Sequence, residues 1–88
     1  MPAEHQKTVL FVDDEPNVLS SLRRVLRREQ LKVLTATSGE EALRTLEQQS
    51  VDVIVSDMRM PEMDGATLLK QVRERYPATI RMILTGYS

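Results

Sequence analysis

Short apolar runs alternate along this chain with longer segments whose apolar residues recur every three or four positions. The runs are rich in branched side chains, as expected of β-strands. In the longer segments, the spacing of the apolar residues is typical of amphipathic helices. The runs cover residues 8–12, 31–35, 51–56 and 80–84. The pattern predicts the order strand, helix, strand, helix, strand, helix, strand, which is an α/β fold with a doubly wound parallel sheet.

Proline and arginine mark the predicted first helix. Pro16 suits the first turn of a helix, because its missing N–H would be unpaired there in any case. Apolar residues then follow at helical spacing, and Arg27 and Arg28 would lie near the C-terminus, where cations complement the helix dipole. The expected span of this helix is residues 17–30.

The next two helices carry capping signals in the sequence. Ser38, with Glu41 three residues later, fits the capping-box pattern at the start of the second helix. Asp64 is a candidate cap for the third helix. That helix should end before Pro77, because the residue before a proline disfavours helical backbone.

Carboxylates follow two of the four predicted strands. Asp13 and Asp14 follow the first strand, Asp57 follows the third, and Thr85 with Gly86 follows the fourth. Ligands bind outside the carboxyl ends of the strands in an open α/β sheet, so all these residues point to one site. Each acid alone would more simply be a cap or a turn residue, and only their coincidence favours chemistry.

An all-oxygen cluster of this kind has a defined chemistry. Several carboxylates at one end of a sheet repel one another unless a cation neutralises them, and a set without His or Cys favours Mg²⁺ or Mn²⁺ over zinc. A carboxylate beside such a cation can accept a phosphoryl group, since the metal bridges carboxylate and phosphoryl oxygens. Asp57 is the best candidate for the acceptor, and Thr85 could donate a hydrogen bond to a phosphoryl oxygen.

Three motifs also stand in the order and at the spacing of a known family. They are Val-Asp-Asp-Glu at 12–15, Asp-Met-Arg-Met-Pro-Glu-Met-Asp-Gly at 57–65 and Leu-Thr-Gly at 84–86. Together they resemble the receiver domain of bacterial two-component response regulators, which has a flavodoxin-like fold. The likeness covers nearly all of the chain after Lys7, so the expected organisation is a polar N-terminal tail at 1–7 and a receiver domain at 8–88.

The resemblance implies a role for each site residue. Asp57 would take a phosphoryl group from the phosphohistidine of a sensor histidine kinase or of a phosphotransfer protein. Asp13 and Asp14 would hold Mg²⁺ (or Mn²⁺) together with Asp57 and the backbone carbonyl of Arg59. Thr85 would be the switch hydroxyl that moves toward the phosphoryl group. The loop and helix start around the site would be formed by Met60, Pro61, Asp64 and Gly65.

The implied function is a phosphorelay switch in which phosphorylation changes an interaction surface. Such a domain is a phosphoprotein that forms an aspartyl phosphate. It is not a classical enzyme, and it would show at most weak self-catalysed phosphotransfer and autodephosphorylation. An output domain is expected if the natural chain is longer.

One departure from the family concerns the C-terminus. Receivers of this family have five strands in the order 2-1-3-4-5, whereas this chain stops after the fourth, so we expect a C-terminally truncated domain. Lys32 and Lys70 belong to the second strand and the third helix, so neither replaces the site lysine of the family's fifth strand. The strand at 80–84 would have an open edge beside apolar side chains, and we therefore expect self-association.

The sequence leaves two other functions as alternatives. An aspartate-nucleophile phosphatase of the haloacid-dehalogenase type also places an Asp at a strand end with magnesium. That family has a second acid two residues later, where this chain has Arg59. A receiver-like interaction module that works without phosphorylation would keep the fold and bind partners directly.

Composition narrows the range of partners and compartments. The 88 residues are 41% hydrophobic and 28% charged, as in one small globular domain. Lys+Arg 12 against Asp+Glu 13 gives a net charge of -1, which predicts no direct contact with nucleic acid. With no cysteine, no secretory signal and no apolar run of about 18 residues, we expect a cytoplasmic protein without membrane contact. The methionines expected to serve packing are Met58, Met60, Met63 and Met82.

Overall fold

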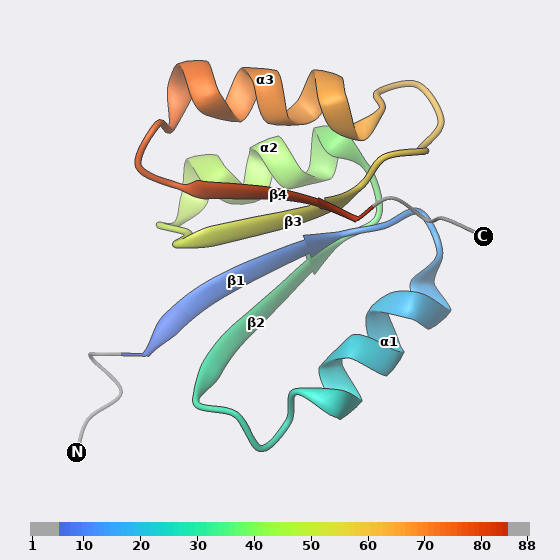
Figure 1. Cartoon of the computed structure of the whole chain (residues 1–88), viewed down its shortest axis with the longest axis vertical. Coiled ribbons are helices and arrows are strands. Elements are labelled where there is room, and N and C mark those ends of the chain that lie inside the picture. Colours follow the sequence, from blue (N-terminus) through green and yellow to red (C-terminus); the bar gives the residue numbers. More distant parts are fainter. Residues whose placement is uncertain (1–5, 85–88) are drawn as a thin grey trace.

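A parallel sheet with helices on both faces forms the body of the protein (Figure 1). The structure is a computed structural model, and it describes residues 6–84. Its strands are β1 (Lys7–Val12), β2 (Leu31–Ala36), β3 (Val53–Asp57) and β4 (Ile80–Leu84), and its helices are α1 (Pro16–Val25), α2 (Gly39–Gln48) and α3 (Gly65–Arg75). The predicted order of elements and the α/β fold class are confirmed, although Lys7 belongs to β1 and not to the predicted tail.

The strands follow the order β2-β1-β3-β4, and each neighbouring pair is parallel. This is the order that the family resemblance implies for the first four strands. The last residue of β1, Val12, is in register with Ser56, and Asp57 is in register with Leu84. The carboxyl ends of β1 and β3 therefore lie side by side at one end of the sheet.

Each face of the sheet has its own apolar core. α2 and α3 cover one face, where Leu10 is fully buried, and α1 covers the other, where Leu19 packs with Phe11 and Val55. Leu10 and Phe11 belong to different cores because successive residues of a strand point to opposite faces. The expectation that Met82 serves packing is wrong. Its side chain is 53% exposed, because no described element covers that side of β4.

Helix α1 ends at Val25, well before the predicted end at residue 30. After Leu26 the backbone hydrogen bonds join residues three apart, as in the bond from the amide of Glu29 to the carbonyl of Leu26 (3.0 Å), and not four apart as in an α-helix. The apolar stripe that holds the helix on the sheet stops at Leu26, so no burial supports a further helical turn. Arg27 and Arg28, which were predicted to belong to the C-terminal part of the helix, therefore lie beyond its end. The last-turn cations are Arg23 and Arg24.

Two residues before β3 anchor the sheet instead of extending the strand. The predicted strand begins at Val51, but β3 begins at Val53. The carboxylate of Asp52 accepts a hydrogen bond from the amide of Thr8 (2.7 Å), and the hydroxyl of Thr79 donates to the carbonyl of Val51 (2.8 Å). These bonds tie β3 to its neighbours at the amino-terminal end of the strands, away from the predicted site.

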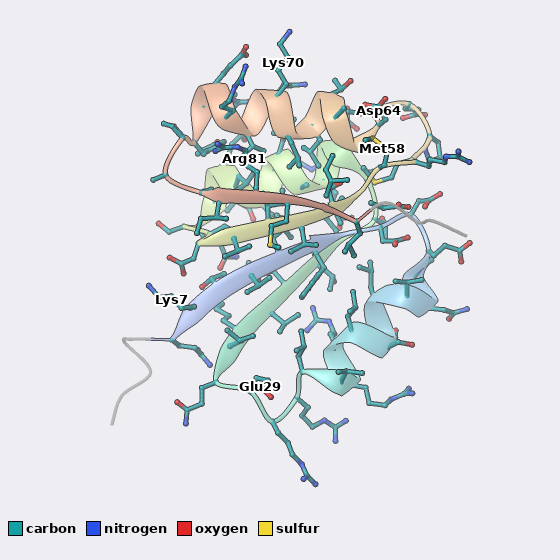
Figure 2. All side chains as sticks on the ribbon, in the orientation of Figure 1. Lys7, Glu29, Met58, Asp64, Lys70 and Arg81 are labelled. Carbon is teal, nitrogen blue, oxygen red and sulfur yellow. The ribbon has the colours of Figure 1, made fainter. Side chains whose placement is uncertain are left out.

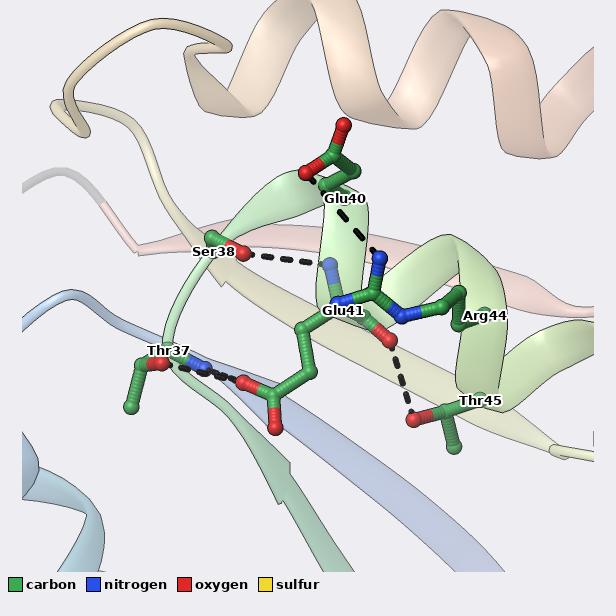
Figure 3. A network of polar contacts seen from close by, with 6 residues as sticks. All are labelled: Thr37, Ser38, Glu40, Glu41, Arg44 and Thr45. Carbon is green, nitrogen blue, oxygen red and sulfur yellow. Dashed lines mark hydrogen bonds and ion pairs between the residues drawn. The ribbon is translucent and has the colours of Figure 1, made fainter.

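The start of α2 is held by a network of side-chain hydrogen bonds (Figure 3). Ser38 caps the helix as predicted, since its hydroxyl oxygen accepts a bond from the amide of Glu41 (3.1 Å). The carboxylate of Glu41 reaches past Ser38 and accepts bonds from the amide and hydroxyl of Thr37 (2.6 and 2.9 Å). A capping box would instead return this carboxylate to the cap residue. Because Thr37 follows β2, the network joins that strand to the helix.

Asp64 caps α3, as its place in the sequence predicts. Its Oδ1 accepts a hydrogen bond from the amide of Thr67 (2.8 Å). That bond, together with one from the hydroxyl of Thr67, holds the pKa of Asp64 below its ordinary value.

Within residues 6–84, none of the helices has the length and apolar character needed to cross a membrane.

Candidate functional site

The three predicted carboxylates meet at the carboxyl end of the sheet. Asp13 and Asp14 follow β1, Asp57 ends β3, and one carboxylate oxygen of each lies within 4.8 Å of the others. Asp13 and Asp57 are half-buried, whereas Asp14 is exposed. The structure thus brings together the acids that the parallel strand order places at one end, in the one such cluster found among residues 6–84.

Asp13 combines a role in a turn with its place in the cluster. Its Oδ1 accepts a hydrogen bond from the amide of Glu15 (2.8 Å), which shapes the turn before α1. Partial burial raises the pKa of Asp13, and repulsion from Asp57, Asp14 and Glu15 raises it further, against the opposing effect of the Glu15 bond. The cluster therefore holds negative charge that its own residues do not neutralise.

Ser56 supports the site, although the sequence pattern did not single it out. It lies directly before Asp57 and is fully buried, and its hydroxyl donates to the carbonyl of Asp57 (2.9 Å). The only feature of the sequence that could have indicated Ser56 was its hydroxyl at the end of the largely apolar run 51–56. This bond holds the backbone of the predicted acceptor.

Backbone contacts tie the loop after Asp57 to its surroundings. The amide of Met58 donates to the carbonyl of Leu84 (3.3 Å), and the amide of Gly65 donates to the carbonyl of Met58 (2.9 Å). Gly65 lies so close to this backbone that a β carbon would overlap the carbonyl oxygen of Asp57. Met60 is buried in the core between the sheet and the helices α2 and α3. The loop is thereby fixed at both its ends and its middle.

Met63 anchors the same loop on α2. Its sulfur lies 2.5 Å from the position that a β carbon of Gly39 would take. Glu62 has a positive φ of 70°, which is uncommon for a residue with a side chain, and the amide of Met63 donates to the carbonyl of Pro61 across it (2.7 Å). A tight turn in the loop thus places Met63 against the first residue of α2.

Of the other predicted site residues, the structure describes Arg59 but not Thr85 or Gly86. Arg59 follows Asp57 by two residues, and its side chain is exposed. Thr85 and Gly86 lie outside the described residues, but the residue before them, Leu84, is in register with Asp57. The metal-binding role of the Arg59 carbonyl and the switch role of Thr85 stay predictions.

The three lysines of the chain lie away from the cluster. Lys7 is the first residue of β1, at the opposite end of the sheet. The Nζ of Lys32 donates to Gln49 Oε1 at the end of α2 (3.0 Å). Lys70 lies on α3 and points away from the sheet (Figure 2). Neither Lys32 nor Lys70 approaches the acids, as the sequence predicts.

The donor set of the cluster fits a hard divalent cation. It offers carboxylate oxygens only, and Mg²⁺ and Mn²⁺ prefer oxygen ligands, of which Mg²⁺ commonly takes one or two carboxylates. A bound cation would also relieve the repulsion that acts on Asp13. The exposure of Asp14 leaves the site open to water and to the oxygens of a phosphoryl group.

Comparison with known proteins finds one family along nearly the whole chain. The model of the response regulator receiver domain matches residues 9–88. The hydrogenase transcriptional regulatory protein HoxA of Cupriavidus necator is 45% identical over 86 residues, which cover 98% of this chain and 18% of that protein. The chain therefore spans less than a fifth of the length of this relative.

Solved structures agree with the sequence relatives. The signal receiver domain of an HD domain-containing protein from Pseudomonas fluorescens Pf-5 has a TM-score of 0.91 at 32% identity, covering 94% of this chain and 66% of that one. The response regulator protein TrrA from Thermotoga maritima, solved in complex with Mg²⁺-BeF, has a TM-score of 0.87 at 34% identity, covering 94% of this chain and 72% of that one.

Proposed function

This chain belongs to the response regulator receiver domain family, and we propose that it accepts a phosphoryl group on Asp57 with the help of Mg²⁺. Receiver domains are signalling domains of two-component systems and not classical enzymes. The observation that carries the proposal is the cluster in which Asp57, at the end of β3, lies close to Asp13 and Asp14.

The proposed transfer is a displacement at phosphorus. A carboxylate oxygen of Asp57 attacks the phosphorus of a phosphohistidine donor, and the new O–P bond forms as the P–N bond of the donor breaks. The electron pair of the broken bond stays on the imidazole nitrogen. Hydrolysis later removes the phosphoryl group. Water attacks the phosphorus as the bond from the phosphorus to the Asp57 oxygen breaks, and the products are the free carboxylate and inorganic phosphate. The chain at most weakly catalyses both steps.

The residues around the acceptor bind the cation and fix the acceptor in place. Receiver domains generally bind Mg²⁺ at an acidic pocket. In this chain Asp13, Asp14 and Asp57 would supply carboxylate ligands for Mg²⁺ or Mn²⁺, with the backbone carbonyl of Arg59 as a further ligand. When bound, such a cation neutralises charge on the carboxylates and on the phosphoryl oxygens.

The proposed partners follow from this chemistry. The donor is a sensor histidine kinase or a phosphotransfer protein, Thr85 is the switch hydroxyl, and an output domain reads the change if the natural chain is longer. The exchange takes place in the cytoplasm, without direct contact with nucleic acid or membrane. The chain also associates with itself, through the apolar side of β4.

The positions of the lysines support a further point about rate. No described lysine lies beside Asp57 to pair with phosphoryl oxygens, since Lys32 bonds to Gln49 and Lys70 points outward. We therefore propose that transfer to these 88 residues alone is slow.

The phosphatase alternative is not favoured, because the position of its second acid is held by Arg59 and the family match is to receivers.

A phosphorylation assay tests the proposal. Acetyl phosphate with Mg²⁺ should add one phosphoryl group, seen by intact mass, to a version of the protein that continues past residue 88, and should add it slowly to the 88-residue chain. Asp57→Asn should add none, whereas Glu62→Gln, which removes a carboxylate from the exposed loop nearby, should behave as the wild type.

Three results would contradict the proposal. They are a label that persists in Asp57→Asn, a label gained equally fast without a divalent cation, and an 88-residue chain that reacts as fast as the longer version. The absence of label from every version would favour the interaction module that works without phosphorylation.

A further inference from the structure

Cationic side chains are concentrated in α1, β2 and the turn between them. Residues 16–37 hold five cations against one acid, Glu29, although the whole chain has a net charge of -1. The five are Arg23, Arg24, Arg27, Arg28 and Lys32. A run of charges on a helix is usually a solvated face. Only the arrangement of these side chains in space can mark a binding site.

Three of the four arginines line one groove between α1 and β2 (Figure 1). The groove has a volume of about 490 Å³, which lies within the range of small-molecule sites. Its residues, here called the arginine groove, are Ser20, Arg23, Arg24, Leu26, Arg27, Leu31 and Val33. The polar members recur at helical spacing along one flank of α1 and the turn after it. The apolar members are half-buried and pack on the core beneath α1.

Arg23 is held in place at the edge of the arginine groove. Its Nη2 donates a hydrogen bond to Thr35 Oγ1 of β2 (3.3 Å). That bond lays the side chain across the strand and leaves its other N–H groups able to donate. A side chain that is already ordered loses less entropy when a ligand binds. The arginine groove is therefore partly preorganised for an acceptor.

The positive charge of the arginine groove is not balanced by described acids. The ion pairs found among residues 6–84 join Glu40 to Arg44 and Glu47 to Arg75, on the other face of the sheet. Helix α1 contains no acid, and Glu29 does not line the groove. The carboxylate cluster lies at the opposite end of α1. An anion is thus the complementary ligand.

We propose that the arginine groove binds a small organic diphosphate, a class that nucleoside diphosphates represent. Its phosphates pair with Arg24 and Arg27, because the planar fork of a guanidinium group matches two phosphate oxygens at once. Its organic group covers the apolar surface of Leu31 and Val33. This ligand uses both kinds of surface that the groove offers.

The extent of the charge favours a small ligand over a macromolecule. Arg28 alone continues the positive surface beyond the groove, since Lys32 points to the other face of the sheet and donates to Gln49 Oε1 (3.0 Å). A protein partner needs a complementary surface of about 800 Å². Nucleic acid needs a basic stripe that is longer than this groove.

The arginine groove is also separate from the proposed phosphoryl site. It lies between the end of α1 and the first half of β2, whereas Asp13 and Asp14 precede α1. All of the residues that line it are described, and β2 is the outer strand on this side of the sheet. The diphosphate therefore binds without a divalent cation.

Calorimetric titration with ADP, at low ionic strength and in buffer freed of divalent cations, tests the proposal. Without such cations ADP cannot bind through a metal at the carboxylate cluster. Arg24→Gln should weaken ADP binding at least about tenfold, which corresponds to 1.4 kcal/mol. Arg28→Gln is the matched control. It removes the same charge from the adjoining turn, outside the groove, and should weaken binding by no more than about twofold, because solvent and salt screen that charge.

Amide shifts in NMR spectra locate the bound ADP. They should move within residues 20–33 and stay in place around residue 57. Both arginines are exposed, so circular dichroism should show cooperative unfolding in both variants. Pyrophosphate, which lacks the organic group, should bind more weakly than ADP.

Several results would overturn the proposal. They are no binding at about 1 mM ADP, equal weakening by the two variants, and shifts centred outside residues 20–33. Pyrophosphate that binds as tightly as ADP would deny the apolar residues a role. Binding to phosphatidylserine vesicles in place of ADP would assign the arginines to a membrane surface. None of these results would bear on phosphoryl transfer to Asp57.

Discussion

Gly65 packs against Asp57 so closely that the carbonyl oxygen of Asp57 fills the space of a β carbon at position 65. The amide of Gly65 also donates to the carbonyl of Met58, the next residue of the loop (2.9 Å). The first residue of α3 thereby fixes the last residue of β3. The position of the predicted acceptor thus depends on a residue that carries no functional group.

Alanine at position 65 should disturb both the fold and the site. Gly65→Ala should destabilise the fold by about 1–3 kcal/mol, because the methyl group meets backbone that cannot move without displacing Asp57. Gly39→Ala is the matched control. It meets the side chain of Met63 and no backbone, so a shift of that side chain can relieve the overlap and the cost should be about 1 kcal/mol or less. Urea unfolding measures the free energy of unfolding of both variants. An equal decrease in the two would contradict the argument that the contact between Gly65 and Asp57 matters.

The buried hydroxyl of Thr79 should contribute measurably to stability. Thr79→Val removes its bond to the carbonyl of Val51 (2.8 Å) and should cost about 1–2 kcal/mol, because that carbonyl loses its partner in a buried place. Thr79→Ser keeps a hydroxyl and should lose less. The comparison uses urea unfolding at neutral pH, and a Val variant as stable as the Ser variant would show that the bond adds nothing.

The cap at Asp64 should make stability depend on pH in the acid range. Bonds from the amide and hydroxyl of Thr67 hold the pKa of Asp64 below its ordinary 3.8. The folded state therefore binds this proton less tightly than the unfolded chain does. The contribution is fully present above that ordinary pKa and is lost as the pH falls through the lower folded value. Asp64→Ala should lower the melting temperature at neutral pH, and its difference from the wild type should shrink in acid. If the difference in melting temperature between the two proteins stays constant across the titration, the charge of Asp64 does not contribute to the cap.

Magnesium should stabilise the chain through the carboxylate cluster. Mass action predicts a gain of about 2.7 kcal/mol when the free ion is a hundredfold above its Kd. The double variant Asp13→Asn/Asp14→Asn should lose this gain, while its residue 13 can still accept the bond from Glu15. Thermal unfolding with and without Mg²⁺ measures the gain, with Glu62→Gln as the control. An unchanged response in the double variant would place the ion elsewhere.

Local chemistry made several elements predictable from the sequence. β4 spans Ile80–Leu84 as predicted, and Ser38 and Asp64 cap their helices, because strand pattern and caps are encoded within a few residues. The end of α1 was not predictable in this way. Arg27 and Arg28 are good helix formers, and only the position of the sheet decides that burial stops at Leu26.

The meeting of the three carboxylates was predictable, but the contacts that support them were not. Parallel strand order is enough to bring Asp13 and Asp57 to one end of the sheet. The bond from Ser56 and the contact of Gly65 depend on where the loop lies in three dimensions, and no local pattern encodes that. The same holds for Glu41, whose carboxylate bonds to the residue before the predicted cap.

The most direct test of the proposed function is to identify the residue that carries the phosphoryl group. A version of the protein that continues past residue 88 is exposed to acetyl phosphate and Mg²⁺ and then treated with borohydride, which reduces an aspartyl phosphate to homoserine. Peptide mass spectrometry then locates the reduced residue. We predict reduction at position 57 alone, and none when the divalent cation is removed. Reduction at position 13 or 14, or no reduction at all with donor and Mg²⁺ present, would contradict phosphoryl acceptance by Asp57.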